Sequence, residues 1–122
     1  WIHRKGAAPA LENKPTVVLG TRGSSSWLML GTGNCRGLNS VAHGAGRRLT
    51  RAEARDKLSA KYRREAVRRT PLGGRVICDQ SELLFEEHPD AYKPIMPVIE
   101  SLTGAGLAIP VAEIEPLITV KQ

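Results

Sequence analysis

The segment TRAEARDKLSAKYRREAVRRTPLGG, residues 50–74, predicts the most regular element of this sequence. Thr50 and Glu53 have the spacing of a capping box, in which the threonine hydroxyl accepts from the amide of residue 53 and the glutamate reaches back. Apolar residues then recur at four-residue spacing, as on one face of a helix, with basic residues around them. These apolar positions are Ala54, Leu58, Tyr62 and Ala66. Since TPLGG at 70–74 ends the pattern, we expect a long basic amphipathic helix over about residues 50–68.

Short apolar segments on both sides of that helix predict strands. They are residues 16–19, 27–30, 75–78, 107–112 and 117–120. Residues 81–87 predict a short helical turn, and apolar spacing over 91–103 predicts a second helix that Pro94 and Pro97 confine or kink. Residues 35–46, rich in glycine, serine and asparagine, predict a loop. Because helices and strands do not alternate regularly, we expect a mixed α+β fold rather than a doubly wound parallel sheet.

Composition bounds the class of protein. A chain of 122 residues has room for one small domain or for a piece of a larger one. With 41% hydrophobic and 25% charged residues, it is typical of a globular chain rather than a disordered tail. It has no apolar stretch of the ~18 residues that a membrane span needs. Cys35 and Cys78 are too few for a disulfide scaffold and fit a reducing compartment, so we expect a cytoplasmic protein. The opening WIHRK, without a signal-like region, suggests an internal cut.

The net charge of +6 is unevenly distributed along the chain. Residues 1–46 carry +4, residues 47–69 carry +7 and residues 70–122 carry −5. The positive field over the first 69 residues either faces a polyanion or is a solvated basic face, and composition favours neither. With only 4% aromatic residues, a stacking platform for single-stranded nucleic acid is disfavoured.

The motif His43-Gly-Ala-Gly-Arg47 is the strongest candidate for chemistry. A neutral histidine nitrogen is a competent nucleophile or metal ligand, and glycines allow a close approach of the backbone to an anion. Arg47 and Arg48 add cationic donors, and the helix expected from Thr50 begins nearby. The alternative is a structural histidine in a loop. GTRGSSS at 20–26 is either a phosphate cradle or a solvated hairpin turn.

Five motifs occur in one order along the chain. They are HRKG at 3–6, GTRGSSS at 20–26, HGAGR at 43–47, DAYK at 90–93 and VK at 120–121. In this order they resemble the carboxy-terminal part of the RtcB family of RNA ligases, and HGAGR is the most diagnostic of them. The resemblance covers essentially the whole chain. It implies that residues 1–122 are a single segment, the carboxy-terminal portion of an RtcB-like catalytic domain.

The resemblance implies a ligase that depends on GTP and manganese. Such an enzyme joins an RNA 3′-phosphate or 2′,3′-cyclic phosphate to a 5′-hydroxyl, in tRNA splicing or RNA repair. On this reading His43 attacks the α-phosphate of GTP and carries GMP as a phosphoramidate, and His3 is a manganese ligand. The other residues implied to contact GMP or GTP are Leu19, Gly20, Thr21, Arg22, Ser26, Gly44, Ala45, Gly46, Tyr92 and Lys121. The basic segment supplies candidate RNA contacts at Arg47, Arg48, Arg51 and Arg55.

The sequence departs from the family pattern in one loop. Leu19-Gly-Thr-Arg-Gly23 stands where the family more usually has Pro-Gly-Ser-Met-Gly, so Arg22 places a cation where the family has an apolar contact. The family's other metal ligands, a cysteine, an aspartate and further histidines, lie upstream of this chain, and Cys35 does not match that cysteine. We therefore expect that this chain alone forms no GMP adduct but binds RNA in a salt-sensitive way. The alternative is a non-catalytic nucleotide-binding or RNA-binding module.

Overall fold

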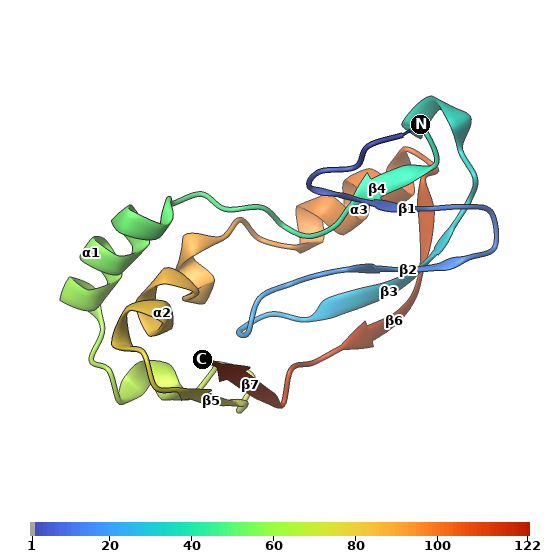
Figure 1. The fold of residues 1–122 in the computed structure, drawn as a ribbon. Coiled ribbons are helices and arrows are strands. Elements are labelled where there is room, and N and C mark those ends of the chain that lie inside the picture. Colours follow the sequence, from blue (N-terminus) through green and yellow to red (C-terminus); the bar gives the residue numbers. More distant parts are fainter. Residues whose placement is uncertain (1) are drawn as a thin grey trace. The chain divides into compact units, whose positions relative to one another are not determined.

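A computed structural model describes residues 2–122, and its elements follow one another as labelled in Figure 1. The strands are β1 (Ala7–Pro9), β2 (Pro15–Val18), β3 (Ser26–Gly31), β4 (Ser40–Ala42), β5 (Arg75–Cys78), β6 (Ala108–Ile114) and β7 (Ile118–Lys121). The α-helices are α1 (Arg51–Lys61), α2 (Ser81–Glu86) and α3 (Met96–Gly104), and short 3-10 helices are η1 (Cys35–Gly37), η2 (Ala66–Arg68) and η3 (Pro89–Ala91). The fold is mixed α+β, as the sequence predicts.

The chain forms two compact units, each built from separate segments. Unit 1 comprises residues 2–20, 25–46 and 94–114, and unit 2 comprises residues 21–24, 47–93 and 115–122. The expectation of one continuous segment of a catalytic domain concerns the longer protein and stays a prediction. Among residues 2–122, no helix has both the length and the apolar character needed to cross a membrane.

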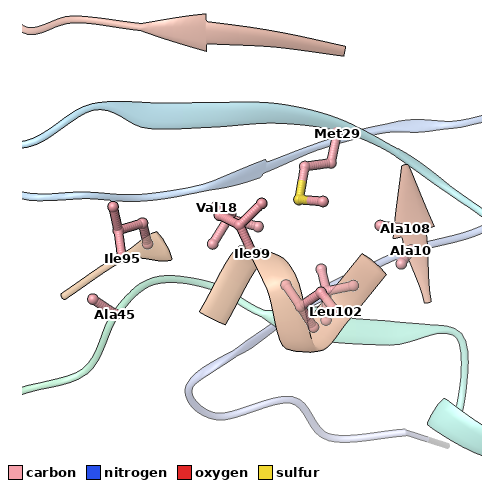
Figure 2. Close-up of a cluster of buried hydrophobic side chains, with 9 residues drawn as sticks. Ala10, Val18, Met29, Ala45, Ile95, Ile99, Leu102 and Ala108 are labelled. Atoms are coloured by element: carbon pink, nitrogen blue, oxygen red, sulfur yellow. The ribbon is translucent and has the colours of Figure 1, made fainter. Parts of the chain in front are cut away.

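Unit 1 contains an antiparallel sheet in the order β2-β3-β6 and a second antiparallel pair, β1-β4. Alternate residues of β2 are buried, as expected when one face of a strand packs on a core. Figure 2 shows that core, in which α3 contributes Ile99 and Leu102 beside Val18 and Met29. The full set of buried residues is Ala10, Val18, Met29, Val41, Ala45, Ile95, Ile99, Leu102 and Ala108.

Unit 2 contains α1, α2 and a parallel pair of strands, β5 and β7. The capping box is confirmed, because the Thr50 side chain accepts from the Glu53 amide and Glu53 accepts from the Thr50 amide. Ala54 and Leu58 on α1 are buried, as their spacing predicts. They join a cluster that contains Ala54, Leu58, Val67, Val76, Cys78, Leu84, Phe85 and Ala91.

The long helix predicted over residues 50–68 is wrong in its second half. α1 ends at Lys61, because Tyr62 takes an extended backbone conformation with φ −120° and ψ 140°. The Tyr62 hydroxyl donates to Asp90 Oδ2 at 2.6 Å and its ring stacks on His88 at 4.6 Å. These contacts turn the chain, so Val67 in η2 enters the core where a continued helix would present Ala66.

Two other expectations need correction. The second helix does not begin at residue 91: residues 89–91 form η3 and α3 starts at Met96, because Pro94 disfavours helical backbone before it and Pro97 is tolerated only in a first turn. The loop predicted over 35–46 contains η1 and β4. The three residues of β4 pair with β1, more than thirty residues away in sequence, and so short a strand carries no periodic pattern. The predicted strands and the short helix at 81–86 are confirmed.

Candidate functional site: the His43 and Gly20 loops

The backbone of unit 1 brings two of the motifs together. Leu19 and Gly44 form an isolated parallel bridge, and the Leu19 amide donates to the His43 carbonyl at 2.8 Å. The His43 amide donates to the Gly6 carbonyl at 3.3 Å. His43 is exposed, and within residues 2–122 its ring makes no hydrogen bond to protein. The histidine therefore has a fixed backbone and an accessible imidazole, which is the arrangement that a nucleophile requires.

Positions 44 and 46, close to His43, favour glycine for two different physical reasons. A Cβ at Gly44 would lie 2.8 Å from the Leu19 carbonyl oxygen, so the close approach of the two backbones excludes a side chain. Gly46 has φ +74°, a left-handed conformation that side chains disfavour, although its surroundings are open. Ala45, between them, is buried in the core of unit 1. In this loop the buried side chain of Ala45 anchors the backbone, and the positions on both sides of it favour glycine.

In the turn at residues 20–26, side-chain hydroxyls accept hydrogen bonds from backbone amides of the same turn. The Gly20 amide donates to Ser26 Oγ at 3.1 Å, and the Thr21 amide donates to Ser24 Oγ at 2.9 Å. The Gly23 amide donates to Thr21 Oγ1 at 3.1 Å. These three amides are therefore already bonded within the turn, and the prediction that the loop contacts a phosphate or guanylate stays a prediction. An incoming phosphate would have to displace hydroxyl acceptors that already satisfy these donors.

Arg22 lies inside unit 2. Only 8% of the residue is exposed, and Nη2 donates to the Leu84 carbonyl at 2.7 Å. Its Nη1 is buried with no hydrogen-bond partner among the described residues, and burial lowers the pKa of the guanidinium. The side chain therefore ties the turn to the α2 segment. The prediction that Arg22 contacts guanylate is untested, and it would compete with this structural contact.

A polar cluster in unit 2 joins two of the other predicted residues. The Tyr92 hydroxyl donates to Glu87 Oε2 and accepts from Arg47 Nη1 at 2.9 Å. Arg47 also forms an ion pair with Glu87 at 3.3 Å and lies over the Tyr92 ring, 4.8 Å from its centroid. Glu87 was missed by sequence reasoning, because nothing in the EE pair at 86–87 distinguishes it from other surface acids.

The charges around Glu87 set its protonation. Burial alone would raise the pKa of this carboxyl. The hydrogen bond from Tyr92 and the positive charges of Arg47, Lys121 and Arg51 outweigh burial and leave the pKa below its ordinary value. Burial and the bond to Glu87 in turn raise the pKa of the Tyr92 phenol. Tyr92 is therefore a protonated donor held by a carboxylate, and Lys121, exposed at the end of β7, acts on the same group.

The four candidate RNA contacts already have partners within unit 2. Arg51 forms an ion pair with Glu87 at 3.7 Å, and Arg55 forms one with Glu82 at 3.3 Å. Arg48 Nε donates to the Asp90 carbonyl at 2.7 Å, and Arg47 contacts Tyr92 and Glu87 as described above. The acidic residues of α2 and its end thus offset part of the positive charge of α1.

The residues of this chain do not complete a manganese site. His3 is exposed near the start of the described chain, and residues 2–122 contain no group of three or more histidine, cysteine or acidic side chains placed to hold a metal ion. A stable site for a divalent transition metal needs several ligands of fixed geometry. His3 alone does not provide one, so its role as a ligand stays a prediction about the longer protein.

Comparison with known proteins gives a consistent result. The family model described as tRNA-splicing ligase RtcB matches residues 1–122. RNA-splicing ligase RtcB2 of Escherichia coli is 47% identical over 122 residues, which are 100% of this chain and 32% of that protein. RNA-splicing ligase RtcB homolog 1 of Entamoeba dispar is 30% identical over 98% of this chain and 25% of its own. tRNA-splicing ligase RtcB of Methanocaldococcus jannaschii is 34% identical over 98% of this chain and 14% of its own. The chain spans at most 32% of these relatives.

Proposed function

Because this chain belongs to the RtcB family, as its motifs predict, we propose that it is the part of an RNA ligase that carries the guanylylated histidine. The proposed reaction joins an RNA 3′-phosphate or 2′,3′-cyclic phosphate to a 5′-hydroxyl with GTP as the activating nucleotide. The relatives are named for tRNA or RNA splicing, and RNA repair uses the same end chemistry. The role belongs to the longer protein, since this chain spans a minor part of its relatives.

The observation that carries the proposal is the setting of His43. Its backbone is held on one side by Gly6 and on the other by Leu19, while its ring is exposed and makes no hydrogen bond to residues 2–122. In the proposed step a neutral ring nitrogen forms a bond to the α-phosphorus of GTP. The bond from that phosphorus to the β-phosphate oxygen breaks, pyrophosphate leaves with its electron pair, and the other ring nitrogen releases its proton.

Residues around His43 support nucleotide binding by their backbone geometry. Gly44 lies against Leu19, so the two segments that the family resemblance assigns to GMP run side by side in unit 1. Positioning of this kind supplies much of the catalysis in phosphoryl transfer, where the protein does little covalent chemistry itself. Manganese belongs to the proposal as a neutraliser of phosphate charge. Apart from His3, its ligands would come from outside this chain.

Labelling with GTP tests the proposal on the full-length protein. Incubation with GTP labelled at the α-phosphate and with manganese should label the protein covalently, and His43→Ala should abolish the label. His88→Ala is the matched control, because it removes a histidine from unit 2 and should leave the label in place. Persistent labelling of the His43→Ala protein would refute the assignment. On the isolated 122-residue chain we expect no added GMP by intact mass, because the metal ligands are incomplete.

The second candidate is a nucleotide-binding or RNA-binding module without turnover. It is favoured by the net charge of +7 over residues 47–69, since lysines and arginines of one segment can contact several phosphates without any turnover. The longer protein decides between the two: if it supplies no cysteine, aspartate and histidine ligands upstream, binding without catalysis is the better description. Titration of the full-length protein with manganese by isothermal calorimetry measures this directly.

A further inference from the structure

The basic residues of unit 2 fall into two groups, according to whether a carboxylate neutralises them. Every basic residue of α1 after its first turn has a carboxylate partner: Arg55 with Glu82 at 3.3 Å, Lys57 with Glu53 at 3.3 Å and Lys61 with Asp90 at 3.2 Å. Beyond α1 the pattern stops. Within residues 2–122, no carboxylate lies within ion-pair distance of Arg63, Arg64, Arg68, Arg69 or Arg75.

Three of these unpaired arginines line one groove. The groove has a volume of ≈ 410 Å³ and lies over η2 and β5. We call it the arginine groove. Its lining residues are Glu65, Arg68, Arg69, Arg75, Val76 and Ile77. Arg68 is held in place because Nη2 donates to the Cys78 carbonyl at 3.1 Å. Across residues 63–75 five arginines accompany a single carboxylate, so this segment keeps a strong positive charge.

Arg69 and Arg75 lie directly opposite each other. Their backbones form an isolated antiparallel bridge, which places both side chains on the same face of the pair. Both arginines are exposed, and neither side chain makes a hydrogen bond to any described residue. Like charges directly opposite each other destabilise a pair of strands. An anion bound between the two guanidinium groups would remove that repulsion.

The chemistry of these side chains favours phosphate as the anion. All five basic residues between positions 63 and 75 are arginines, and a guanidinium presents a planar fork that binds phosphate through two parallel hydrogen bonds. Among residues 2–122, no aromatic side chain lines the groove, so a base finds none there on which to stack. Contact with the backbone of a nucleic acid, independent of sequence, is therefore the recognition that the groove fits.

We propose that the arginine groove binds the phosphate backbone of an RNA strand, and that it, rather than the ion-paired face of α1, is the main RNA contact surface of unit 2. The choice of RNA as the polyanion rests on the proposed ligase function. The position of the surface rests only on the charge pairing and the groove. An acidic protein segment is the competing occupant, and the experiment below includes it.

Fluorescence anisotropy with a labelled single-stranded RNA tests the proposal on the full 122-residue chain. Each phosphate contact on a single strand contributes ~0.7 to the slope of log affinity against log salt. The double variant Arg69→Gln/Arg75→Gln should therefore lower the slope by about 1.4 and the affinity at 0.1 M salt by about 25-fold, taking the electrostatic contribution as zero at 1 M. The control Lys57→Gln/Lys61→Gln removes the same charge from ion-paired positions and should leave the slope unchanged.

Arginine side-chain NMR of the unmodified chain gives a measurement that does not depend on how the variants fold. RNA should shift the Nε–Hε signals of Arg69 and Arg75 but not the lysine signals of α1. Equal losses from both double variants, or no loss from the arginine pair, would overturn the proposal. So would displacement of RNA by a poly-glutamate peptide at equal charge concentration, since it would show an acidic-protein surface.

The two proposals fail separately. If the unmodified full-length protein takes up no GMP label, or if His43→Ala keeps the label, while groove binding is intact, the ligase assignment alone is refuted. Equal salt slopes in the two double variants, with GMP labelling intact, refute the arginine groove alone. The His43→Ala chain should bind the same RNA as the unmodified chain, because the groove lies entirely within unit 2.

Discussion

Replacing Gly44 by alanine places a methyl group against the backbone of Leu19. The added Cβ would lie 2.8 Å from the Leu19 carbonyl oxygen, a backbone atom that no rotamer change can move. The two segments must separate to relieve the contact. That separation strains the bond from the Leu19 amide to the His43 carbonyl, which is 2.8 Å long.

The expected cost follows from two contributions. Overpacking a site that cannot rearrange costs about 1–3 kcal/mol. Weakening one intramolecular hydrogen bond adds at most about 0.5–1.5 kcal/mol. We therefore expect Gly44→Ala to destabilise unit 1 by about 2 kcal/mol, within a range of roughly 1–4 kcal/mol. Gly104→Ala is the matched control: outside its chain neighbours and its own helix backbone, no atom of residues 2–122 lies within 4 Å of the added Cβ, and Gly104 ends helix α3.

Urea unfolding followed by far-UV circular dichroism measures both variants. Gly44→Ala should lower the midpoint, whereas Gly104→Ala should leave it unchanged or raise it, because alanine favours helix over glycine by about 1 kcal/mol. In the full-length protein Gly44→Ala should also reduce GMP labelling, since the displaced segment carries His43. If the two variants have midpoints that correspond to the same stability within ~0.5 kcal/mol, the close approach of the two segments has been misjudged.

Three further changes have defined outcomes. Arg22→Met should lower stability in urea unfolding less than Arg22→Ala, because both variants remove the donor to the Leu84 carbonyl and the unpartnered Nη1, whereas only the alanine leaves a cavity. The amide of residue 50 is the largest cause of the low Glu53 pKa of about 2, followed by the Thr50 hydroxyl. Since Thr50→Ala keeps the amide and removes only the hydroxyl, the Glu53 pKa should rise part of the way toward its ordinary value, as read by carboxyl carbon NMR. The stabilisation that Glu53 provides is present above its unfolded pKa and lost as the pH falls through the folded value, so this loss should move to higher pH in the variant. Met29→Ala, at a side chain with no exposure, should cost about 2–5 kcal/mol, while Leu11→Ala, half exposed, should cost under ~0.5 kcal/mol in the same urea experiment.

Local patterns predicted the elements whose determinants lie within a few residues. The capping box at Thr50 and Glu53 uses only its own turn, and the alternation at Thr16 and Val18 reflects one buried face. Tyr62 shows where such reasoning stops. Its spacing continues the helix, but the bond of its hydroxyl to Asp90, twenty-eight positions along the chain, ends the helix instead. Tertiary contacts of this kind override propensity and leave no local signal.

In the candidate site, too, residues with a local sequence motif could be predicted, whereas residues defined by tertiary contacts could not. The HGAGR motif located His43, and the structure explains the glycine beside it through the close approach of Leu19. Glu87 gave no signal, because its importance comes from Tyr92 and Arg47 around it. The sequence also could not predict which arginines lack a carboxylate partner. Composition counts every arginine alike, whereas the ion pairs depend on where α2 packs.

The pairing of early strands with late ones has a consequence for synthesis on the ribosome. β3 pairs with β6, and Gly31 meets Ala108 in that register, seventy-seven positions later. At roughly 5–20 residues per second, the ribosome needs about 4–15 s to make the intervening chain. During that interval one edge of β3 has no partner strand. β5 likewise has no partner strand until β7 has been synthesised. The nascent chain therefore carries open strand edges, which pair readily with other chains, until residues 108–121 have emerged.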